Sequence, residues 1–596
     1  MAVYKKAVGE QHFDYAKTLI EAGNMLAQTS KLAEAEKYIL LGSQLMLNYI
    51  QKNFLNLSEA EKMKWWTTNS SYFECIPSFL LIHKDASATF LQQACSIQMQ
   101  QKSVVLLDGI KTMLIARKKG NPELLVLLEQ WQMNKAMLAK QYSIPAIDRM
   151  NNLDSLEVLT NEQEKNVNNQ SSSIMGLAKS QQIGFKDIQK KLKPNEAAIE
   201  FLQFELNRKD WTDSTFYAAF IMLPNDTVPH FVTLCEEQQL ARLLDSKNNT
   251  QEGFVKQLYR STIGGTGSQA SINKGDSLYE LIIKPLQPFL NRITTLYIAP
   301  VGLLNRVSFD ALPIAKNILA IEKYTIRQYN GINQLAEEKH TSAINSTATF
   351  YGGINYQISS PEKTKFGKTI LTLPDAVKRN MGGNGFTYLP GTLEEVNSIQ
   401  ALFASNQKST QLLIDTFATE ESFKSLSGHS PTIIHVSTHG FSLPNAKHIN
   451  ADENQFTLAD NPLLRTGIVM AGANKVWTGN SSIQQKEDGI LTAYEISNLD
   501  LSNTELVVLS ACETALGDIK GTEGVFGLQR AFKLAGAKNM IMSLWQVPDK
   551  ETVELMTIFY SHKLNGMSIY ESFNKAKNAM RKKYAPYYWA AFVLIE

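Results

Sequence analysis

From Pro194 onward the chain alternates short runs of β-branched and aromatic residues with longer stretches of helical pattern. Between most of the later runs lie about 10 to 20 residues with apolar positions every three or four, which is typical of helices that link parallel strands. This alternation predicts an α/β fold built on a mostly parallel sheet with flanking helices. The runs are 197–202, 216–223, 230–234, 296–300, 349–354, 432–438, 505–511, 539–544 and 589–595.

The first 50 residues have a different pattern of apolar and polar residues. Residues 13–50 predict two amphipathic helices with a break at Gln28-Thr29-Ser30, and small residues at Gly23 and Ala35 stand where two helices of a hairpin approach closely. This spacing resembles a tetratricopeptide (TPR) hairpin. Because a lone repeat cannot bury both of its faces, we expect the chain to start at the end of a longer repeat array, as a truncated piece.

Residues 58–187 keep a helical pattern without the repeat and contain no strand signal. Within them, the polar stretch 161–173 is interpreted as a loop or a solvated helix end rather than a site. At 596 residues the chain exceeds one hydrophobic core, so an all-α region followed by α/β units is expected.

Composition narrows the class of protein. The formal net charge of +2 gives no reason to expect a nucleic-acid partner or an anionic membrane surface. No apolar run approaches the roughly 18 residues needed to span a bilayer, and the first residues lack the apolar core of a signal peptide. The four cysteines are widely spaced and form no CxxC pair, so we expect a soluble cytoplasmic protein without disulfides.

Two residues at strand ends carry the candidate chemistry. His439 follows a β-branched run and precedes Gly440, and the carboxyl edge of a parallel sheet is where catalytic groups gather. His435, four residues earlier, is interpreted as a hydrogen-bonded structural histidine. On one strand the two imidazoles stand roughly 13 Å apart, which is too far to share a metal ion, so no metal site is expected.

Cys512 ends the apolar run 505–511 in the same way. A cysteine in such a place is more often a buried core thiol than a nucleophile. Its location at a strand-to-loop junction, with a histidine at an equivalent junction, favours a Cys–His nucleophile pair. The chain has no GxSxG sequence, so a serine hydrolase of the α/β type is set aside.

A series of ordered motifs resembles the CHAT domain, a caspase-like module often fused to TPR arrays. The motifs are HVSTHGF, NPLLRTGIVMAGAN, DGILTAYEI, LVVLSACETALG, GTEGVFGLQRAFKLAGA, MSLWQVPD and YYWAAFVLIE. The resemblance covers roughly residues 270–596, and more loosely the strands from 188 onward. It implies a TPR-like hairpin at 1–57, a helical region at 58–187, an inactive caspase-like half at 188–345 and an active half at 346–596.

By this resemblance, His439 matches the family's catalytic histidine and Cys512 its nucleophile, and the backbone N–H groups of Gly440 and Cys512 are expected to form an oxyanion hole. Ser510, two residues before the nucleophile, is expected to line the substrate pocket. Its small hydroxyl predicts an uncharged residue before the cut.

Four more residues are candidates for this pocket. Ser543 and Trp545 are expected to form another wall, where the indole either stacks on the substrate or fills the core. If Asp549 or Asp488 points into the pocket, a substrate Lys or Arg is favoured instead.

The first hypothesis for function is a cysteine endopeptidase that cleaves a specific protein and is regulated by a protein partner through the TPR-like helices. The resemblance also implies a role in bacterial defence or programmed cell death. The second hypothesis is a non-catalytic scaffold for protein–protein interaction. A Cys–His mechanism requires no cofactor, so none is expected.

Overall fold

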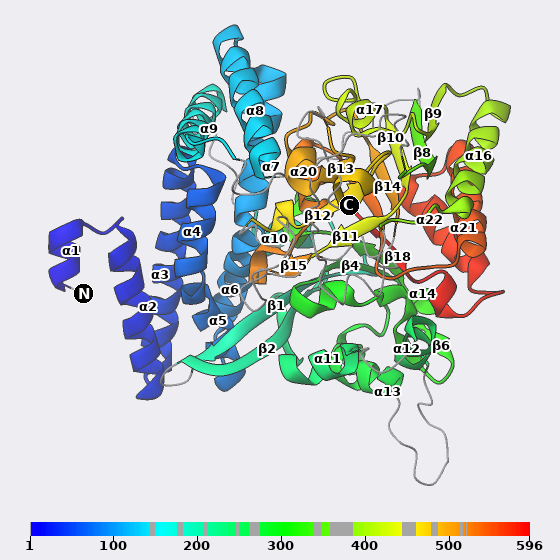
Figure 1. Ribbon diagram of the computed structural model, residues 1–596. Coiled ribbons are helices and arrows are strands. Elements are labelled where there is room, and N and C mark those ends of the chain that lie inside the picture. Colours follow the sequence, from blue (N-terminus) through cyan, green and yellow to red (C-terminus); the bar gives the residue numbers. More distant parts are fainter. Residues whose placement is uncertain are drawn as a thin grey trace. The chain divides into compact units, whose positions relative to one another are not determined.

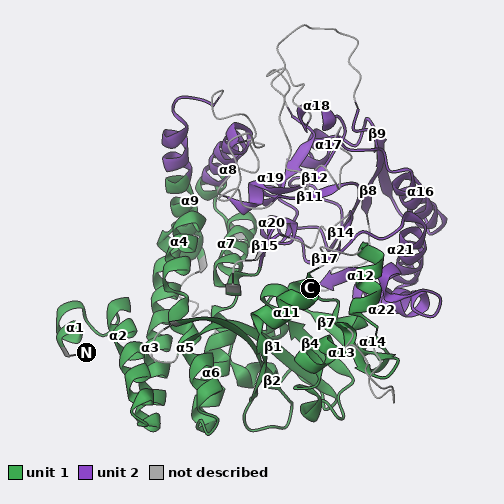
Figure 2. Cartoon of the chain, turned by 60° about the horizontal axis from the view of Figure 1, so that its bottom comes forward, with its two compact units in different colours: residues 1–125, 161–340, 520–524 green, residues 126–160, 341–519, 525–596 purple. Residues whose placement is uncertain are grey.

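A computed structural model gives the fold of the chain (Figure 1). The structure describes residues 2–142, 149–175, 183–207, 211–245, 250–260, 274–337, 347–357, 385–443, 461–477, 487–511, 517–519 and 521–596. The chain forms two compact units, coloured green and purple in Figure 2. The first contains residues 1–125, 161–340 and 520–524, and the second contains 126–160, 341–519 and 525–596.

The first unit begins with the predicted helical hairpin. Helix α2 (Phe13–Gln28) and helix α3 (Leu32–Asn53) follow the short α1 (Ala2–Val8), and the chain turns between them at Thr29–Lys31. A β-carbon on Gly23 would lie 2.7 Å from the Ile39 side chain, and one on Gly42 would lie 2.7 Å from the Ala16 carbonyl oxygen. The hairpin is therefore packed as closely as its small residues predict.

The helical pattern continues as predicted through the following residues. The helices are α4 (Glu59–Asn69), α5 (Ser71–Ile82), α6 (Ala88–Gln101), α7 (Val104–Lys119), α8 (Pro122–Tyr142), α9 (Leu153–Met175) and α10 (Phe185–Gln189). The polar stretch 161–173 lies inside α9 rather than in a loop. Its polar groups have partners there: the Asn168 amide donates to the carbonyl oxygen of Leu57, and Lys165 pairs with Glu61 and Glu162.

Five strands form the sheet of the first unit, in the order β3-β2-β1-β4-β7. Strands β1, β2 and β3 are antiparallel, whereas β4 and β7 run parallel to β1. The strands are β1 (Glu196–Asn207), β2 (Trp211–Met222), β3 (His230–Glu236), β4 (Thr295–Ala299) and β7 (Thr325–Gln328).

Shorter elements complete this unit. They are α11 (Glu237–Leu244), α12 (Gln251–Leu258), α13 (Lys274–Leu278), a π-helical turn (Tyr279–Ile283), β5 (Pro313–Ala315), β6 (Ile318–Leu319) and α14 (Ala320–Lys323).

Six strands form the main sheet of the second unit, in the order β18-β17-β14-β10-β8-β9. All neighbours are parallel except β17 and β18, so the predicted mostly parallel sheet is confirmed. The strands are β8 (Ala348–Ile354), β9 (Thr410–Asp415), β10 (Ile433–Ser437), β14 (Leu506–Ser510), β17 (Asn539–Ser543) and β18 (Phe592–Ile595).

Helices cover both faces of this sheet (Figure 1). Phe350 on β8 packs against Phe403 of α16 (Pro390–Ser405) and Tyr560 of α21 (Asp549–Leu564). The next residue, Tyr351, points to the opposite face and packs against Phe423 of α17 (Glu420–Lys424). Successive residues of one buried strand thus anchor two different helical layers. Helices α19 (Ala493–Ser497), α20 (Leu528–Ala535) and α22 (Ile569–Met580) complete these layers.

A second, three-stranded antiparallel sheet follows the end of β10. Its order is β11-β12-β13, from β11 (Gly440–Ser442), β12 (Thr466–Val469) and β13 (Ile490–Thr492). A two-stranded hairpin joins β15 (Asp518–Ile519) to β16 (Val525–Phe526). Among the described helices, none combines the length and the apolarity needed to cross a membrane.

Candidate active site

His439 lies just beyond the carboxyl end of β10, where the chain passes into β11. Its ring stands between two aromatic rings, with centroids 5.2 Å from Tyr356 and 5.4 Å from Phe386. Its Nε2 atom is 2.8 Å from the main-chain carbonyl oxygen of Thr387. These contacts hold the imidazole in one orientation.

The hydrogen bond to Thr387 also assigns the proton of the ring. A carbonyl oxygen only accepts, so Nε2 carries the hydrogen, and in the neutral ring Nδ1 is the unprotonated nitrogen. Burial lowers the pKa of His439, opposed in part by the hydrogen bond to the Thr387 carbonyl. The imidazole is therefore mainly neutral at pH 7 and available as a base.

A set of polar and aromatic contacts supports this pocket around the histidine, and none of them was predicted from the sequence. The Asn474 amide bonds both main-chain groups of Phe386, accepting from its N–H at 2.6 Å and donating to its carbonyl at 2.8 Å. Phe386 packs in turn on Trp477, with ring centroids 4.8 Å apart. The NPLLRTGIVMAGAN motif ends at Asn474. The motif therefore included this residue, but it did not reveal that the side chain binds the backbone of Phe386.

Gly440 opens β11 opposite Ile468 of β12. In this ladder the His439 carbonyl accepts from the Val469 N–H at 3.0 Å, and the Leu443 N–H donates to the Arg465 carbonyl at 2.8 Å. Because hydrogen-bonded pairs alternate along an antiparallel ladder, the N–H of Gly440 points away from β12. The Gly440 N–H is therefore not used in this ladder, and its role as an oxyanion donor stays a prediction.

Cys512 lies outside the described residues, but the strand that leads to it is described. Strands β10 and β14 are parallel neighbours, and their register pairs Ser437 with Ser510. His439 and Cys512 each follow this pair by two residues along the chain. The pairing of these two residues, and the Cys512 N–H as an oxyanion donor, stay predictions.

The other three cysteines are buried and free. Burial raises the pKa of the thiols of Cys75 and Cys235 to about 12, and raises that of Cys95 well above its usual range. Thiols of this kind are unreactive at neutral pH.

His435 has the structural role predicted for it. The side chain is fully buried on β10, and its Nδ1 lies 3.1 Å from the Tyr560 hydroxyl. Its Nε2 lies 3.1 Å from Oε1 of Glu395 on α16. Both ring nitrogens are thus engaged inside the fold, and the prediction is confirmed.

Three of the predicted pocket residues have buried side chains with defined hydrogen bonds. Ser510 donates to Oε2 of Glu395 at 3.0 Å, and Ser543 donates to the carbonyl oxygen of Ala511 at 2.5 Å. The indole N–H of Trp545 donates to the Tyr587 carbonyl at 2.9 Å. For Trp545 these contacts favour the core-filling alternative, and the pocket itself stays a prediction.

The two candidate aspartates lie in different surroundings. Asp549 is the first residue of α21, where its carboxylate accepts from the Gly391 N–H, and burial raises its pKa. Asp488 accepts from the Ile490 N–H at 2.8 Å, and burial raises its pKa to about 7. Both carboxylates are engaged by main-chain groups, and neither role in a pocket is tested.

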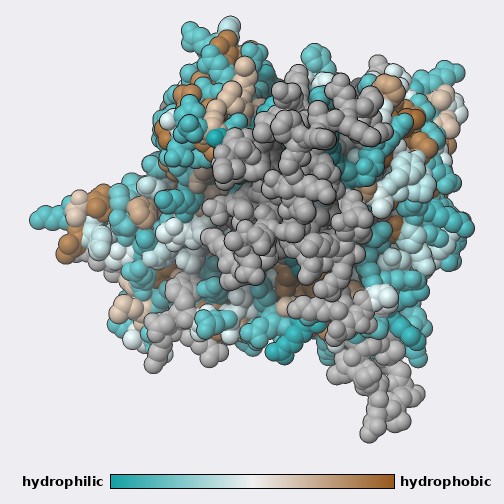
Figure 3. Space-filling model, in the orientation of Figure 1, coloured by the Kyte–Doolittle hydropathy of each residue, from teal (hydrophilic) through white to brown (hydrophobic). Residues whose placement is uncertain are grey.

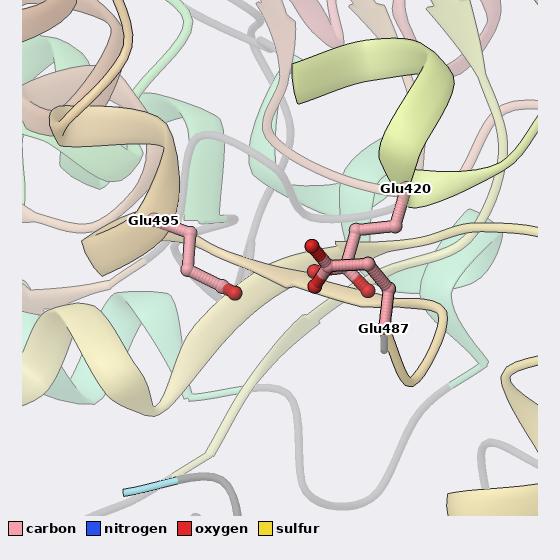
Figure 4. A group of neighbouring side chains, drawn as sticks. All are labelled: Glu420, Glu487 and Glu495. Atoms are coloured by element: carbon pink, nitrogen blue, oxygen red, sulfur yellow. The ribbon is translucent and has the colours of Figure 1, made fainter. Parts of the chain in front are cut away.

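Asp488 adjoins three glutamates, Glu420, Glu487 and Glu495, whose carboxylates converge with the spacing of a metal site (Figure 4). The Lys424 ammonium lies 2.6 to 2.9 Å from all three. Burial, together with repulsion from the neighbouring carboxylates, raises the pKa of Glu420, while the surrounding carboxylates raise that of Lys424 against the effect of burial. A protein cation therefore already lies among these carboxylates.

The second unit is thus an α/β unit with a mostly parallel sheet, and His439 is held at the carboxyl edge of that sheet. A family model described as the CHAT domain matches residues 273–596, more than half of the chain. The chain therefore belongs to the CHAT-domain family, and the predicted family is confirmed.

Curated relatives match a smaller part of the chain. Tetratricopeptide repeat protein 28 of Mus musculus is 37% identical over 109 residues, and the same protein of Homo sapiens is 34% identical over 109 residues. Each match covers 18% of this chain and 4% of the relative. The chain therefore spans only a small fraction of the length of these relatives.

Solved structures are similar at low identity. The Arg-specific cysteine proteinase gingipain R is 11% identical, with a TM-score of 0.32 over 55% of this chain and 68% of that chain. The Saccharomyces cerevisiae separase–securin complex is 11% identical, with a TM-score of 0.35 over 100% of this chain and 47% of that chain.

Proposed function

We propose that the chain is a cysteine endopeptidase in which His439 activates Cys512. The observation that carries this proposal is the orientation of His439 at the end of β10. Its Nε2 is bound to the Thr387 carbonyl, its Nδ1 is therefore the unprotonated nitrogen of the neutral ring, and burial lowers its pKa. The neighbouring parallel strand, β14, leads to Cys512 two residues after its own end.

The reaction then follows from the groups at this edge. Nδ1 of His439 takes the thiol proton, and the thiolate attacks the carbonyl carbon of a peptide bond, moving an electron pair onto the oxygen. The N–H groups of Gly440 and Cys512 bind this oxyanion, and one such donor lowers a barrier by about 3 kcal/mol. The C–N bond breaks as the imidazolium protonates the amine, and water activated by His439 hydrolyses the thioester.

A peptidyl electrophile that reacts with cysteine tests this proposal without a known substrate. We expect native labelling to map to Cys512 by mass spectrometry, to be absent in Cys512→Ala and to fall at least 100-fold in His439→Ala. Cys235→Ala is the matched control, because that thiol is buried and its pKa is raised. Equal labelling of wild type and His439→Ala would remove the dyad and favour the non-catalytic scaffold.

Cleavage of a peptide library addresses the residue before the cut. Since the Ser510 hydroxyl is uncharged, we propose that the pocket takes an uncharged side chain. A strict preference for Lys or Arg would instead assign a carboxylate, Asp549 or Asp488, to the pocket. Asp549→Asn and Asp488→Asn would then distinguish the two, because only the variant at the true site loses the preference.

We also propose that the helical region controls the segment that follows Cys512. Glu523, eleven residues after Cys512, is buried, and its two carboxylate oxygens accept from the N–H groups of Val105 and Leu106 at 3.0 and 3.3 Å. The Ser103 N–H donates to the Thr522 carbonyl at 2.9 Å. The Glu523 carboxylate thus caps the N-terminus of α7 and joins this helix to the segment that follows Cys512. Such bonds are strong because a helix N-terminus has unpaired N–H groups and favours negative charge.

A protein regulator that binds the TPR-like helices is part of this proposal. Apolar side chains are exposed on them, including Val3 and Tyr4 of α1 and Met25 of α2. Brown side chains mark this part of the surface in Figure 3. Exposed apolar groups on a helical hairpin are typical of a surface that receives another protein.

Glu523→Gln tests the link between α7 and the segment after Cys512, since it keeps the shape but loses the charge. We expect faster hydrogen exchange at the start of α7 and at residues 521–526, together with at least threefold slower labelling of Cys512. Glu280→Gln, a change on an exposed surface helix, is the control. Faster exchange with unchanged labelling would contradict a regulatory link.

A further inference from the structure

Glu395 bonds to the last residues of the two strands that precede His439 and Cys512 in the chain. It belongs to α16, and its side chain is buried. Its Oε2 accepts from the Ser437 hydroxyl at 2.6 Å and from the Ser510 hydroxyl at 3.0 Å. These serines lie 42 and 115 residues away along the chain.

The two serines are matched in position. Ser437 is the last residue of β10 and Ser510 is the last residue of β14, and they are direct partners in the parallel register. Each stands two residues before a proposed catalytic residue. One carboxylate oxygen therefore joins the ends of the two strands, at the last rung before the chain leaves the sheet.

The other carboxylate oxygen is held as well. Oε1 lies 3.1 Å from Nε2 of His435, and Nδ1 of His435 lies 3.1 Å from the hydroxyl of Tyr560 on α21. The carboxylate, which only accepts, thus meets three donors from two strands. Three hydrogen bonds to one buried carboxyl group fix its position in the fold.

From this geometry we propose that Glu395 is a positioning residue, which holds the ends of β10 and β14 together so that His439 and Cys512 meet. This inference rests on the proposed peptidase function. Glu395 acts through the strands and not on the substrate. Losing one of its two acceptor oxygens loosens the strand ends, and the histidine then activates the thiol less well.

The pH dependence of Cys512 alkylation measures this pairing directly. A thiol activated by a histidine reacts below its ordinary pKa of about 8.5, and loss of the pairing moves the reaction back toward that value. In Glu395→Gln we expect the apparent pKa of alkylation to rise by about one unit and kcat for a library substrate to fall about tenfold, with KM within twofold. Glu394→Gln, an exposed neighbour on the same helix, is the matched control.

Ser437→Ala is the second variant, for the case in which Glu395→Gln does not fold. It removes one bond to the carboxylate and lies outside the predicted substrate pocket. We expect the rise in the alkylation pKa and the fall in kcat to be roughly a third as large as in Glu395→Gln. Combining Ser437→Ala with Glu395→Gln should cause no further loss of kcat. If Glu395→Gln and Ser437→Ala both match the Glu394→Gln control in the pH dependence of alkylation and in kcat, the positioning role is wrong.

The proposed function fails by a different result. If wild-type Cys512 is alkylated with the pH dependence of an ordinary thiol, and His439→Ala changes nothing, the dyad is absent. If wild type shows the activated profile and Glu395→Gln keeps it, the dyad stands and the role of Glu395 alone is wrong.

Discussion

In each of the two units, the strands of the main sheet bury a carboxylate close to the carboxyl end of a parallel strand, but the two units use it differently. In the first unit Glu200 lies on β1, and the Lys102 ammonium donates to it at 2.5 Å and to the carbonyls of Phe201 and Ala299. In the second unit the carboxylate comes from a helix and accepts from the strands.

This difference has a consequence for each sheet edge. Ala299 is the last residue of β4, so Lys102 covers the end of that strand with a saturated ion pair. The second oxygen of Glu200 accepts from the Ile332 N–H at 2.9 Å. In the second unit the Glu395 contacts end at Ser437 and Ser510, and His439 follows two residues after the first of these. An ion pair thus covers the strand end in the first unit, whereas the strand ends of the second unit lead to the residues proposed as catalytic.

The largest expected effect comes from breaking the ion pair of the first unit. Lys102→Met leaves Glu200 buried without its cation, and burial already raises the pKa of Glu200. We expect the free energy of unfolding to fall by about 3–5 kcal/mol, measured by urea denaturation. The double variant Lys102→Met/Glu200→Gln is the control and should recover most of the loss. A loss below about 1 kcal/mol would mean that the pair does not hold this edge closed.

A smaller effect is expected from the outer end of the polar network in the second unit. Tyr560→Phe removes the hydroxyl partner of His435 Nδ1 and leaves the Glu395 contacts in place. We expect a loss of about 1 kcal/mol in unfolding free energy, because one buried hydrogen bond is removed. Tyr4→Phe, on the exposed surface of α1, is the control. A loss as large as that of Lys102→Met would erase the contrast between the two networks.

The smallest expected effect is on the stability of the fold at acidic pH, and it involves His439. Its folded pKa is lowered, so below about pH 6.5 the unfolded chain binds more protons and the folded state loses stability as pH falls toward the folded pKa. His439→Gln removes this contribution, and we expect it to lose less stability than wild type between pH 7.5 and 5, by less than about 1 kcal/mol. The exposed His429→Gln serves as the control variant. Equal acid losses in wild type and His439→Gln would contradict the lowered pKa.

The sequence predicted those strands and helices that are determined by a local pattern of residues. The runs at 432–438 and 505–511 became the parallel neighbours β10 and β14, and the break at Gln28–Ser30 became the turn between α2 and α3. Strand β9 was missed because it is only partly buried, so its residues do not form a continuous apolar run.

Long-range contacts explain the other misses. The polar stretch 161–173 is helical because its side chains meet partners about a hundred residues away, such as Glu61 and the Leu57 carbonyl. Glu395 was missed for the same reason, since a glutamate on an amphipathic helix gives no sign that two serines from other strands converge on it. Family motifs supplied His439 and Cys512, but not the groups that support them.

The acceptor that orients His439 is a main-chain oxygen, and this affects how the site tolerates mutation. Every amino acid at position 387 brings the same carbonyl, and the Thr387 side chain is exposed. Most substitutions there should therefore leave the imidazole in place. A residue essential for orientation would then look freely variable in a mutational scan, whereas changes at Asn474, which holds the neighbouring backbone of Phe386, would carry the cost.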